Sequence, residues 1–309
     1  MSDAITAGAT ERGQILDGKA TAMAVRETVA ARVRVLAGEG VVPGLAVVLV
    51  GEDPASQVYV RNKDKAARTA GINVQTRKLD ASVSQAELEA VVAELNGDSS
   101  VNGILVQLPL PKSLDEQRIV ESIDPVKDVD GLHPNNVAAL VQGSAGLVPC
   151  TPAGCIELLD RHAIEIEGKN VVVVGRSQLV GKPVAQLALM RNATVTICHS
   201  RTNDLAAEVG RADILVAAVG RAKLVKGEWV KPGAAVLDVG INRGDDGKLV
   251  GDVDFEAARQ RAAWITPVPG GIGPMTIAML LSNTVTACAR QRGLVELLAS
   301  AEPSGAEKD

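Results

Sequence analysis

The sequence predicts an α/β protein of two domains, each built from parallel strands joined by crossover helices. Three observations lead to this prediction. The 309 residues exceed the size at which a single core usually stops growing. Short apolar segments that end in glycine alternate with longer segments of helical periodicity. A stretch rich in Pro, Gly, Asn and Asp divides this alternation into two runs.

The first run predicts three helices and three strands. Helical patterns cover residues 17–38, about 54–70 and 84–96, the last with Ser84 as its expected N-cap. Apolar strand patterns cover residues 45–51, 72–79 and 103–111, and prolines stop the third strand at its carboxyl end.

The second run predicts five short buried strands, at residues 170–175, 194–198, 213–220, 234–240 and 264–266. Between the runs, residues 124–154 have the composition of a loop-rich connection, so we expect a boundary near residue 150. The expected domains are residues 1–149 and 150–281. The polar tail at residues 301–309 is expected to be disordered.

Charge and composition exclude several classes of protein. The net charge of -5 argues against a nucleic-acid surface, because affinity for a polyanion comes mainly from clustered Lys and Arg. Four cysteines without a CxxC pair predict buried thiols in a reducing cytoplasm, with no disulfide scaffold and no metal site. The N-terminus has no signal-peptide pattern and no apolar run approaches a membrane span, so we expect a soluble, cytoplasmic protein.

The segment VVVVGRSQLVGKP has the order of a nucleotide-binding turn. A strand ends at Gly175, a loop follows to Gly181, and Pro183 lies in the first turn of the next helix. Free N–H groups and the helix dipole at such a helix start favour a phosphate. The glycines are spaced GxxxxxG, not GxGxxG, so an ordinary tight loop remains an equal alternative at this point.

The next strand favours NADP over NAD. In NAD-binding units an acidic residue at the end of this strand binds the ribose 2′-hydroxyl. Here the strand is followed by His199, Ser200, Arg201 and Thr202, and the first acid is Asp204. Hydroxyls and a guanidinium bind a 2′-phosphate that a carboxylate would repel, and Arg176 and Ser177 can reach the same phosphate. A solvated basic loop is the competing interpretation.

A further glycine-rich segment, TPVPGGIGPMT at residues 266–276, precedes an apolar helix expected to begin near Met275. Such a loop brings bare backbone close to a flat or charged ligand, and includes Pro269, Gly270 and Gly271. Thr276 is expected either to contact a cofactor or to cap the helix.

Three polar features of the first half predict a reaction site. Ser56, Tyr59 and Lys63 share one face of the helix at 54–70, and Tyr59 is the single tyrosine. Gln107 lies at the carboxyl end of a strand, where ligand crevices form in α/β sheets. Asp130 precedes Gly131 in a third segment, KDVDG. Each has an ordinary structural explanation; our hypothesis is that they converge on one crevice.

The Tyr-x-x-x-Lys spacing is also that of short-chain dehydrogenases, in which the tyrosine is the catalytic acid. In those enzymes the glycine-rich turn precedes the Tyr-Lys pair. Here the pair precedes the turn at Gly175 by more than a hundred residues, so chain order argues against that class.

Taken together, the motifs resemble the bifunctional methylenetetrahydrofolate dehydrogenase and methenyltetrahydrofolate cyclohydrolase (FolD) family. The resemblance runs from about Asp17 to Gly293, through GEDPASQVYVRNKDKAARTAGI, GILVQLPLP, PVKDVDGLHPNN, PCTPAG, VVVVGRSQLVGKP, CHSRT, DVGIN and TPVPGGIGPMTIAMLLSNT. Ala138 and Ala139 depart from the family's usual pattern after the NN turn, which is expected to alter packing near the folate loop.

The resemblance implies a role for each site residue. Lys63 would be the central catalytic group, oriented by Gln107, with Tyr59 packed on the folate and Asp130 holding the pterin. The cofactor would contact Gly175, Arg176, Ser177, Ser200, Ile241 and Thr276, and Pro269, Gly270 and Gly271 would line the substrate.

The resemblance also implies the architecture and the pathway. It implies a Rossmann-type second domain, a cleft between the domains, and a C-terminal helix at about 282–300 that packs back on the first domain. It further implies a homodimer and a place in one-carbon metabolism and purine biosynthesis. Two alternatives stay open here: an NADP oxidoreductase with an unrelated carbonyl substrate, and a nucleotide-binding module without turnover.

Overall fold

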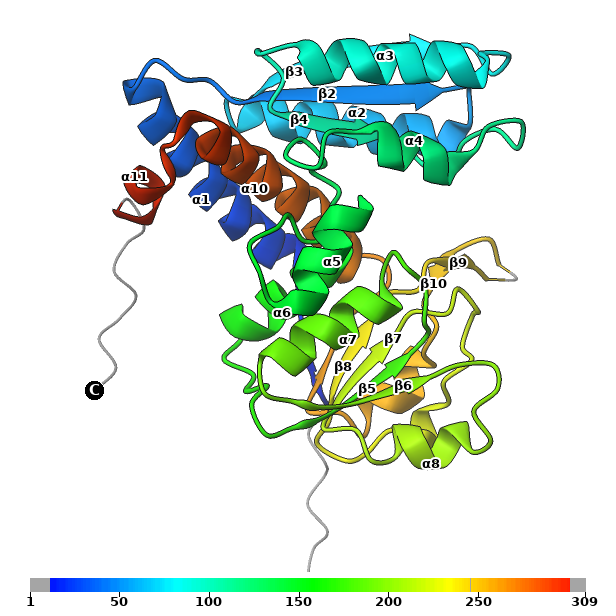
Figure 1. The fold of residues 1–309 in the computed structure, drawn as a ribbon. Helices are drawn as coiled ribbons and strands as arrows, with labels where there is room; N and C mark the ends of the chain where they lie inside the picture. Colours follow the sequence, from blue (N-terminus) through cyan, green and yellow to red (C-terminus); the bar gives the residue numbers. More distant parts are fainter. Residues whose placement is uncertain (1–11, 245, 301–309) are drawn as a thin grey trace, which may run out of the picture. The chain divides into compact units, whose positions relative to one another are not determined.

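The computed structural model describes residues 12–244 and 246–300 (Figure 1). The expectations for the polar N-terminus up to residue 11 and for the tail at 301–309 lie outside the described residues. The chain forms two compact units. We call them the three-stranded unit (Lys19–Gly154 with Pro274–Asp309) and the six-stranded unit (Met1–Gly18 with Cys155–Gly273).

The three-stranded unit contains a parallel sheet in the order β3-β2-β4, with bounds Asn73–Leu79, Gly44–Val50 and Gly103–Val106. Every residue of β2 and β4 is buried, as expected for the apolar strands of a parallel sheet. Its helices up to residue 142 are α1 (Gly18–Gly38), α2 (Pro54–Thr69), α3 (Gln85–Gly97), α4 (Glu116–Ser122) and α5 (Pro134–Gln142). Leu88, Val92 and Leu95 of α3 pack on the sheet in one apolar core.

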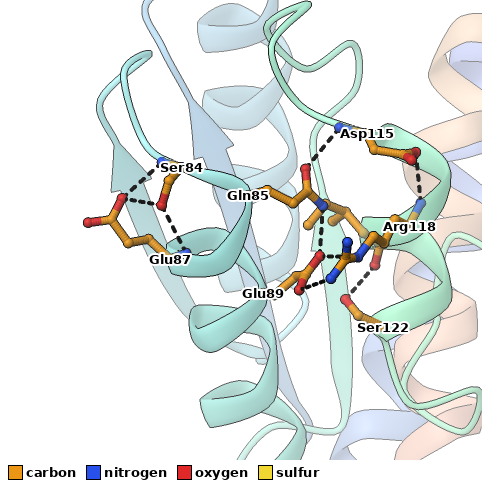
Figure 2. Close-up of polar contacts among 8 residues, drawn as sticks. Ser84, Gln85, Glu87, Glu89, Asp115, Arg118 and Ser122 are labelled. Carbon is orange, nitrogen blue, oxygen red and sulfur yellow. Dashed lines mark hydrogen bonds and ion pairs between the residues drawn. The ribbon is translucent and has the colours of Figure 1, made fainter.

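Helices α3 and α4 are joined by polar contacts that fix the segment after β4 (Figure 2). Ser84 and Glu87 form a capping box at the start of α3. The Gln85 side chain accepts the Asp115 N–H at 2.9 Å, and Arg118 pairs with Glu89 at 2.6 Å. Glu116, in the first turn of α4, then accepts the Leu110 N–H at 2.7 Å, so α4 holds the chain just beyond Gln107.

Helix α5 corrects the expectation that residues 124–154 are only a loop-rich connection. His133 caps the helix by accepting the Asn135 N–H, Pro134 occupies the first turn, and Gly143 ends it in the left-handed conformation. The Pro, Asn and Gly that suggest a loop are the start and stop signals of a short helix. Ala138 and Ala139 lie within it, and Gly146 has room for no Cβ because that atom would lie 2.9 Å from the Ala139 Cβ.

Helices α10 (Ile272–Arg292) and α11 (Val295–Ser300) end the described chain. By length and composition α10 could cross a membrane, which corrects the expectation that no apolar run is long enough. More than half of its apolar window is buried. Asn283 donates to the Val129 carbonyl at 2.9 Å and Gln291 to the Asn102 carbonyl at 2.8 Å, so α10 is bonded into the three-stranded unit.

The six-stranded unit contains a parallel sheet in the order β1-β11-β8-β7-β5-β6. The strands are β1 (Gln14–Ile15), β5 (Asn170–Val174), β6 (Thr194–Cys198), β7 (Ile214–Ala217), β8 (Ala235–Asp238) and β11 (Trp264–Ile265). The helices of this unit are α6 (Cys150–Arg161), α7 (Gly181–Met190), α8 (Leu205–Val209) and α9 (Phe255–Arg259); the first residues of α6 belong to the other unit. The unit also contains the 3-10 turn Gly227–Trp229 and the antiparallel strand pair β9 (Asn242–Arg243) and β10 (Leu249–Val250).

Strand order reverses at β5, because β6 lies on one side of it and β7 on the other. In open α/β sheets, ligands bind outside the carboxyl ends of the strands at this switch point.

Strand β1 belongs to a different unit from the one expected, because the sequence placed residues 1–149 in a single first domain. Gln14 donates to the Ala263 carbonyl at 2.8 Å, so this segment joins the six-stranded sheet. Two residues are too few to show a strand period in the sequence.

Candidate functional site

Helix α2 carries Tyr59 and Lys63. Asp53 caps the helix by accepting the Ser56 N–H at 2.7 Å, and Pro54 occupies its first turn. Lys63 is buried, with 7% of its surface exposed, while Tyr59, one turn earlier, is 41% exposed. Ser56 is also buried, and its backbone N–H completes the cap. The helix therefore offers an amine beside an exposed aromatic ring.

Gln107 meets Lys63 from the end of β4. The Gln107 backbone N–H donates to the Val48 carbonyl at 2.9 Å, which continues the sheet by one residue. Its side-chain Nε2 donates to the Leu108 carbonyl at 2.7 Å, so Oε1 is turned toward Lys63 Nζ and accepts from it at 3.1 Å. The predicted pairing of a strand-end amide with the helical amine is present.

Asp130 completes the cluster. Burial raises the pKa of the Asp130 carboxyl, the positive charge of Lys63 opposes that rise, and the negative charge of Asp128 adds to it. Gly131 has φ +72°, and a Cβ there would lie 2.5 Å from the Pro149 nitrogen. Only glycine therefore allows the chain to turn directly after Asp130. Lys63, Gln107 and Asp130, expected to converge, lie together.

Two residues of this site were not singled out from the sequence. The Cys150 thiol donates to the Val129 carbonyl at 3.3 Å, directly before Asp130, and burial raises the pKa of that thiol well above its usual range, so it stays protonated. Asn283 Nδ2 donates to the Val129 and Val148 carbonyls at 2.9 and 2.8 Å, on either side of the Asp130 turn. The segments PCTPAG and LLSNT contain Cys150 and Asn283, but no local sequence pattern predicts the hydrogen bonds that these two residues make.

The six-stranded unit holds the predicted nucleotide turn. Gly175 has φ +127°, and a Cβ on it would lie 2.1 Å from the Ala218 oxygen. A Cβ on Gly181 would lie 2.3 Å from the Gly175 oxygen, so the turn closes only with glycine at both positions. Ser177 Oγ accepts the Val180 and Gly181 N–H groups at 3.1 and 3.3 Å, which shapes the start of α7.

Adjacent strands bring the predicted phosphate ligands to one edge. Strands β5 and β6 are paired, and the Gly175 N–H donates to the Cys198 carbonyl at 2.9 Å. Arg176 and Ser177 after β5, and Ser200 after β6, are exposed there. Asp204 accepts the Ala207 N–H as the N-cap of α8, so the first acid after β6 serves the helix. This set of donors fits the 2′-phosphate of NADP.

The loop predicted to line the substrate is tightly built. Gly271 donates to the Pro267 carbonyl at 2.8 Å, and a Cβ on Gly271 would lie 2.6 Å from the Thr266 Cβ. Gly270 has φ +110°, and Pro269 is exposed. Ile241, after β8, is 48% exposed. Gly270 and Gly271 are themselves buried, so Pro269 and Ile241 supply the exposed surface, and the ligand contacts of all four residues stay a prediction.

Thr276 is not grouped with the other predicted cofactor residues. It lies in the first turns of α10, on the part that belongs to the three-stranded unit, and its hydroxyl shares a hydrogen bond of 2.9 Å with Thr151. A cofactor contact by Thr276 therefore stays a prediction. Across residues 12–244 and 246–300, no cluster of three or more His, Cys, Asp or Glu side chains could hold a metal ion.

A switch-point sheet with this glycine turn, together with a lysine–amide–carboxyl cluster in a separate α/β unit, defines a two-domain dinucleotide-dependent enzyme. The family model for the tetrahydrofolate dehydrogenase/cyclohydrolase catalytic domain matches residues 16–130, and the model for the NAD(P)-binding domain of the same family matches residues 149–292. The chain belongs to the tetrahydrofolate dehydrogenase/cyclohydrolase family.

Individual relatives agree over most of the chain. The bifunctional protein FolD of Moorella thermoacetica is 59% identical over 277 residues, covering 90% of this chain and 99% of that protein. The Acidiphilium cryptum protein of the same name is 60% identical over 279 residues, with coverage of 90% and 99%. These matches exclude the short-chain dehydrogenase alternative.

Two solved structures share the fold. The bifunctional FolD enzyme of Campylobacter jejuni aligns with a TM-score of 0.88 at 46% identity, covering 90% of this chain and 99% of that chain. The Trypanosoma brucei methylenetetrahydrofolate dehydrogenase-cyclohydrolase, in complex with NADP cofactor and inhibitor, aligns with a TM-score of 0.86 at 43% identity, covering 91% and 99%.

Proposed function

We infer that the protein oxidises 5,10-methylenetetrahydrofolate to 5,10-methenyltetrahydrofolate with NADP and hydrolyses the product to 10-formyltetrahydrofolate. The observation that carries the assignment of the reaction site is the 3.1 Å hydrogen bond from Lys63 Nζ to Gln107 Oε1, beside the half-buried Asp130. The family supplies the two activities, and we propose that this cluster performs the hydrolytic one.

The oxidation needs little acid–base help from the protein. The bridging carbon of the substrate lies between two nitrogens whose lone pairs stabilise the cation left when hydride departs. NADP, when bound, accepts that hydride. The contribution of this chain is positioning: the Gly175 turn, Arg176, Ser177 and Ser200 hold the adenosine end, and the exposed Tyr59 ring offers a face for the folate.

The hydrolysis requires movement of protons. Water attacks the methenyl carbon, the bond from this carbon to one ring nitrogen breaks, and the carbon becomes the formyl group on the other nitrogen. The attacking water loses both of its protons: one goes to the leaving nitrogen, and the other is released to solution, which removes the positive charge of the methenyl cation. We propose that Lys63 serves both transfers, with Gln107 fixing its orientation, because one amine can accept and then donate a proton.

Asp130 is proposed to hold the pterin. A carboxyl group accepts hydrogen bonds from the amino and ring N–H groups of such a heterocycle. Cys150 and Asn283 both donate to the Val129 carbonyl and so fix the turn from which Asp130 projects.

The test is a spectrophotometric assay of the wild-type protein with 5,10-methylenetetrahydrofolate. Methenyl formation is followed with NADP and with NAD, and its decay to the formyl product is followed without cofactor. We expect both reactions, with a kcat/KM for NADP well above that for NAD. Reduction of an unrelated carbonyl substrate without folate turnover, or cofactor binding without either reaction, would support the two alternatives named above.

The cellular setting is also part of the proposal. A formyl donor of this kind serves purine biosynthesis, and we propose a cytoplasmic protein that binds neither nucleic acid nor membrane, in keeping with the net charge of -5. We propose a homodimer, as the family resemblance implies. Strand β6, at the edge of the six-stranded sheet with Ile197 exposed, is available for such contact. Light scattering at several concentrations tests this state.

A further inference from the structure

Asp252 is a fully buried carboxylate in the six-stranded unit, between β10 and α9. It accepts four N–H groups from two other segments. Oδ2 accepts the Val219 and Gly220 backbone N–H at 2.6 and 3.0 Å. Oδ1 accepts the Arg221 backbone N–H at 2.8 Å and the Asn242 side-chain amide at 2.9 Å. No member of the four-donor set is a charged side chain, so the carboxylate serves backbone geometry and not an ion pair.

The three backbone donors lie at the switch point of the sheet. Residues 219–221 follow β7 after one intervening residue, and β7 pairs with β5, the strand that ends in the Gly175 turn. The residue between, Ala218, donates its N–H to the Val174 carbonyl at 2.8 Å, and its oxygen is the atom that a Cβ on Gly175 would meet at 2.1 Å. The loop held by Asp252 is therefore in contact with the nucleotide turn itself.

Asp252 is in turn fixed by a second buried carboxyl, Asp238, at the end of β8. Asp238 accepts the backbone N–H groups of Gly240, Asp252 and Val253 at 3.0, 2.8 and 2.9 Å. Its own N–H donates to Thr266 Oγ1 at 2.7 Å, at the start of the Pro269 loop. One hydrogen-bonded chain thus joins the loops after β7, β8 and β11.

The close approach of these groups depends on two glycines. A Cβ on Gly240 would lie 2.2 Å from an Asp252 carboxyl oxygen, and one on Gly251 would lie 1.8 Å from Asp238 Oδ2. A side chain at either position would force the Asp252 or Asp238 carboxyl group away from its N–H donors, so these hydrogen bonds require glycine at both positions.

We propose that Asp252 is a positioning residue for the dinucleotide: an internal anion that fixes the backbone of residues 219–221 opposite the Gly175 turn. This inference rests on the proposed function. Consecutive backbone N–H groups of this kind form an anion-binding nest. Because the Asp252 carboxylate fills the nest, a cofactor phosphate is directed to the start of α7 instead. Asp252 acts on cofactor binding and has no part in folate hydrolysis.

The experiment is Asp252→Asn in the full-length protein. An amide has one acceptor oxygen, and its NH2 group opposes the remaining N–H donors, so part of the loop loses its partner. We expect KM for NADP to rise by roughly tenfold or more, as expected for lost buried hydrogen bonds, with kcat of the oxidation nearly unchanged. Cyclohydrolase turnover, which uses Lys63 in the other unit, is expected to stay at the wild-type value.

Asp254→Asn is the matched control, since Asp254 lies two residues further on, is partly exposed and makes no side-chain cap bond. Amide hydrogen exchange gives a readout without cofactor: exchange of the Val219, Gly220 and Arg221 N–H groups is expected to accelerate in Asp252→Asn and not in Asp254→Asn. Unchanged exchange or an unchanged KM for NADP overturns the proposal.

A milder variant keeps the test decisive if Asp252→Asn unfolds the six-stranded unit. Asn242→Leu removes one of the four donors and leaves the carboxylate in place; a smaller rise in KM for NADP supports the proposal, and none overturns it. If the wild-type protein shows no NADP-dependent oxidation, the proposed function is overturned. The proposal for Asp252 is then still tested separately, because hydrogen exchange measures without cofactor whether Asp252 holds residues 219–221.

Discussion

Two buried lysines of the described chain show why Lys63 is suited to chemistry. Lys127 and Lys63 are each 7% exposed. Lys127 Nζ donates to the carbonyls of Leu95, Asn96 and Asp98, so all three of its donors are used at the end of α3. Lys63 Nζ donates to one side chain, Gln107. Its remaining donors are directed at no protein acceptor within hydrogen-bonding distance in the described structure, and we propose that they serve a substrate.

The buried carboxyl of Asp238 makes the stability of the fold depend on pH. Burial raises the pKa of Asp238 to about 7, against three backbone N–H donors that lower it. An acid with a raised pKa in the folded state contributes stability that is fully present below its unfolded pKa and is lost as pH rises through 7. The difference between 3.8 and about 7 corresponds to roughly 4 kcal/mol.

We therefore expect the free energy of unfolding of the wild type to fall between about pH 4 and pH 7 relative to Asp238→Asn, by up to roughly 4 kcal/mol. The amide mimics the neutral acid and does not titrate. Urea unfolding followed by tryptophan fluorescence measures this, because Trp229 and Trp264 both lie in the six-stranded unit. A wild-type-to-variant difference that is independent of pH would refute the account of Asp238.

At the scale of elements, helix starts and strand ends place the site. The sequence predicted α2 and the face shared by Tyr59 and Lys63, since helical periodicity and the start near Pro54 are local signals; the Asp53 cap is seen only in the structure. It also predicted Gln107 at a strand end. The bond from Cys150 to the Val129 carbonyl and the Asn283 bridge could not be predicted, because they join segments distant in the chain and have no periodic signal.

The cap of α2 gives a prediction for this element. Asp53→Ala removes the acceptor of the Ser56 N–H, and loss of such a cap costs about 1 kcal/mol. We expect cyclohydrolase activity to be lost at a temperature lower by a few degrees, while Glu52→Ala, the exposed neighbour, has no effect. Equal inactivation temperatures for wild type and Asp53→Ala would show that the cap does not stabilise the helix of Lys63.

The paired ends of β5 and β6 give a second prediction. Ser200→Asp combined with Arg176→Ala replaces phosphate ligands by a carboxylate, so we expect the kcat/KM ratio of NADP to NAD to fall by roughly a hundredfold, mainly through KM. Arg211→Ala, an exposed arginine paired with Glu208, is the control. A double variant that retains the wild-type preference would place the 2′-phosphate elsewhere.

For the whole molecule, the alternation of strands and helices predicted two α/β units, and the family match covers both. Composition and periodicity did not predict which of the two units contains each terminal segment. Gln14–Ile15 adds to the far edge of the six-stranded sheet, and residues 274–300 return to the unit that contains α1 to α5. Such exchanges of terminal segments depend on tertiary hydrogen bonds, for example Gln291 with Asn102, which composition and periodicity do not encode.

The central claim is that Lys63 performs the hydrolysis and that the cofactor is held elsewhere in the chain. The most direct measurement is cyclohydrolase turnover of Lys63→Met beside NADP binding by the same protein, with Lys65→Met, an exposed lysine of the same helix, as the control. We predict loss of methenyltetrahydrofolate hydrolysis by at least roughly a hundredfold with an unchanged Kd for NADP. Wild-type hydrolysis by Lys63→Met would contradict the assignment.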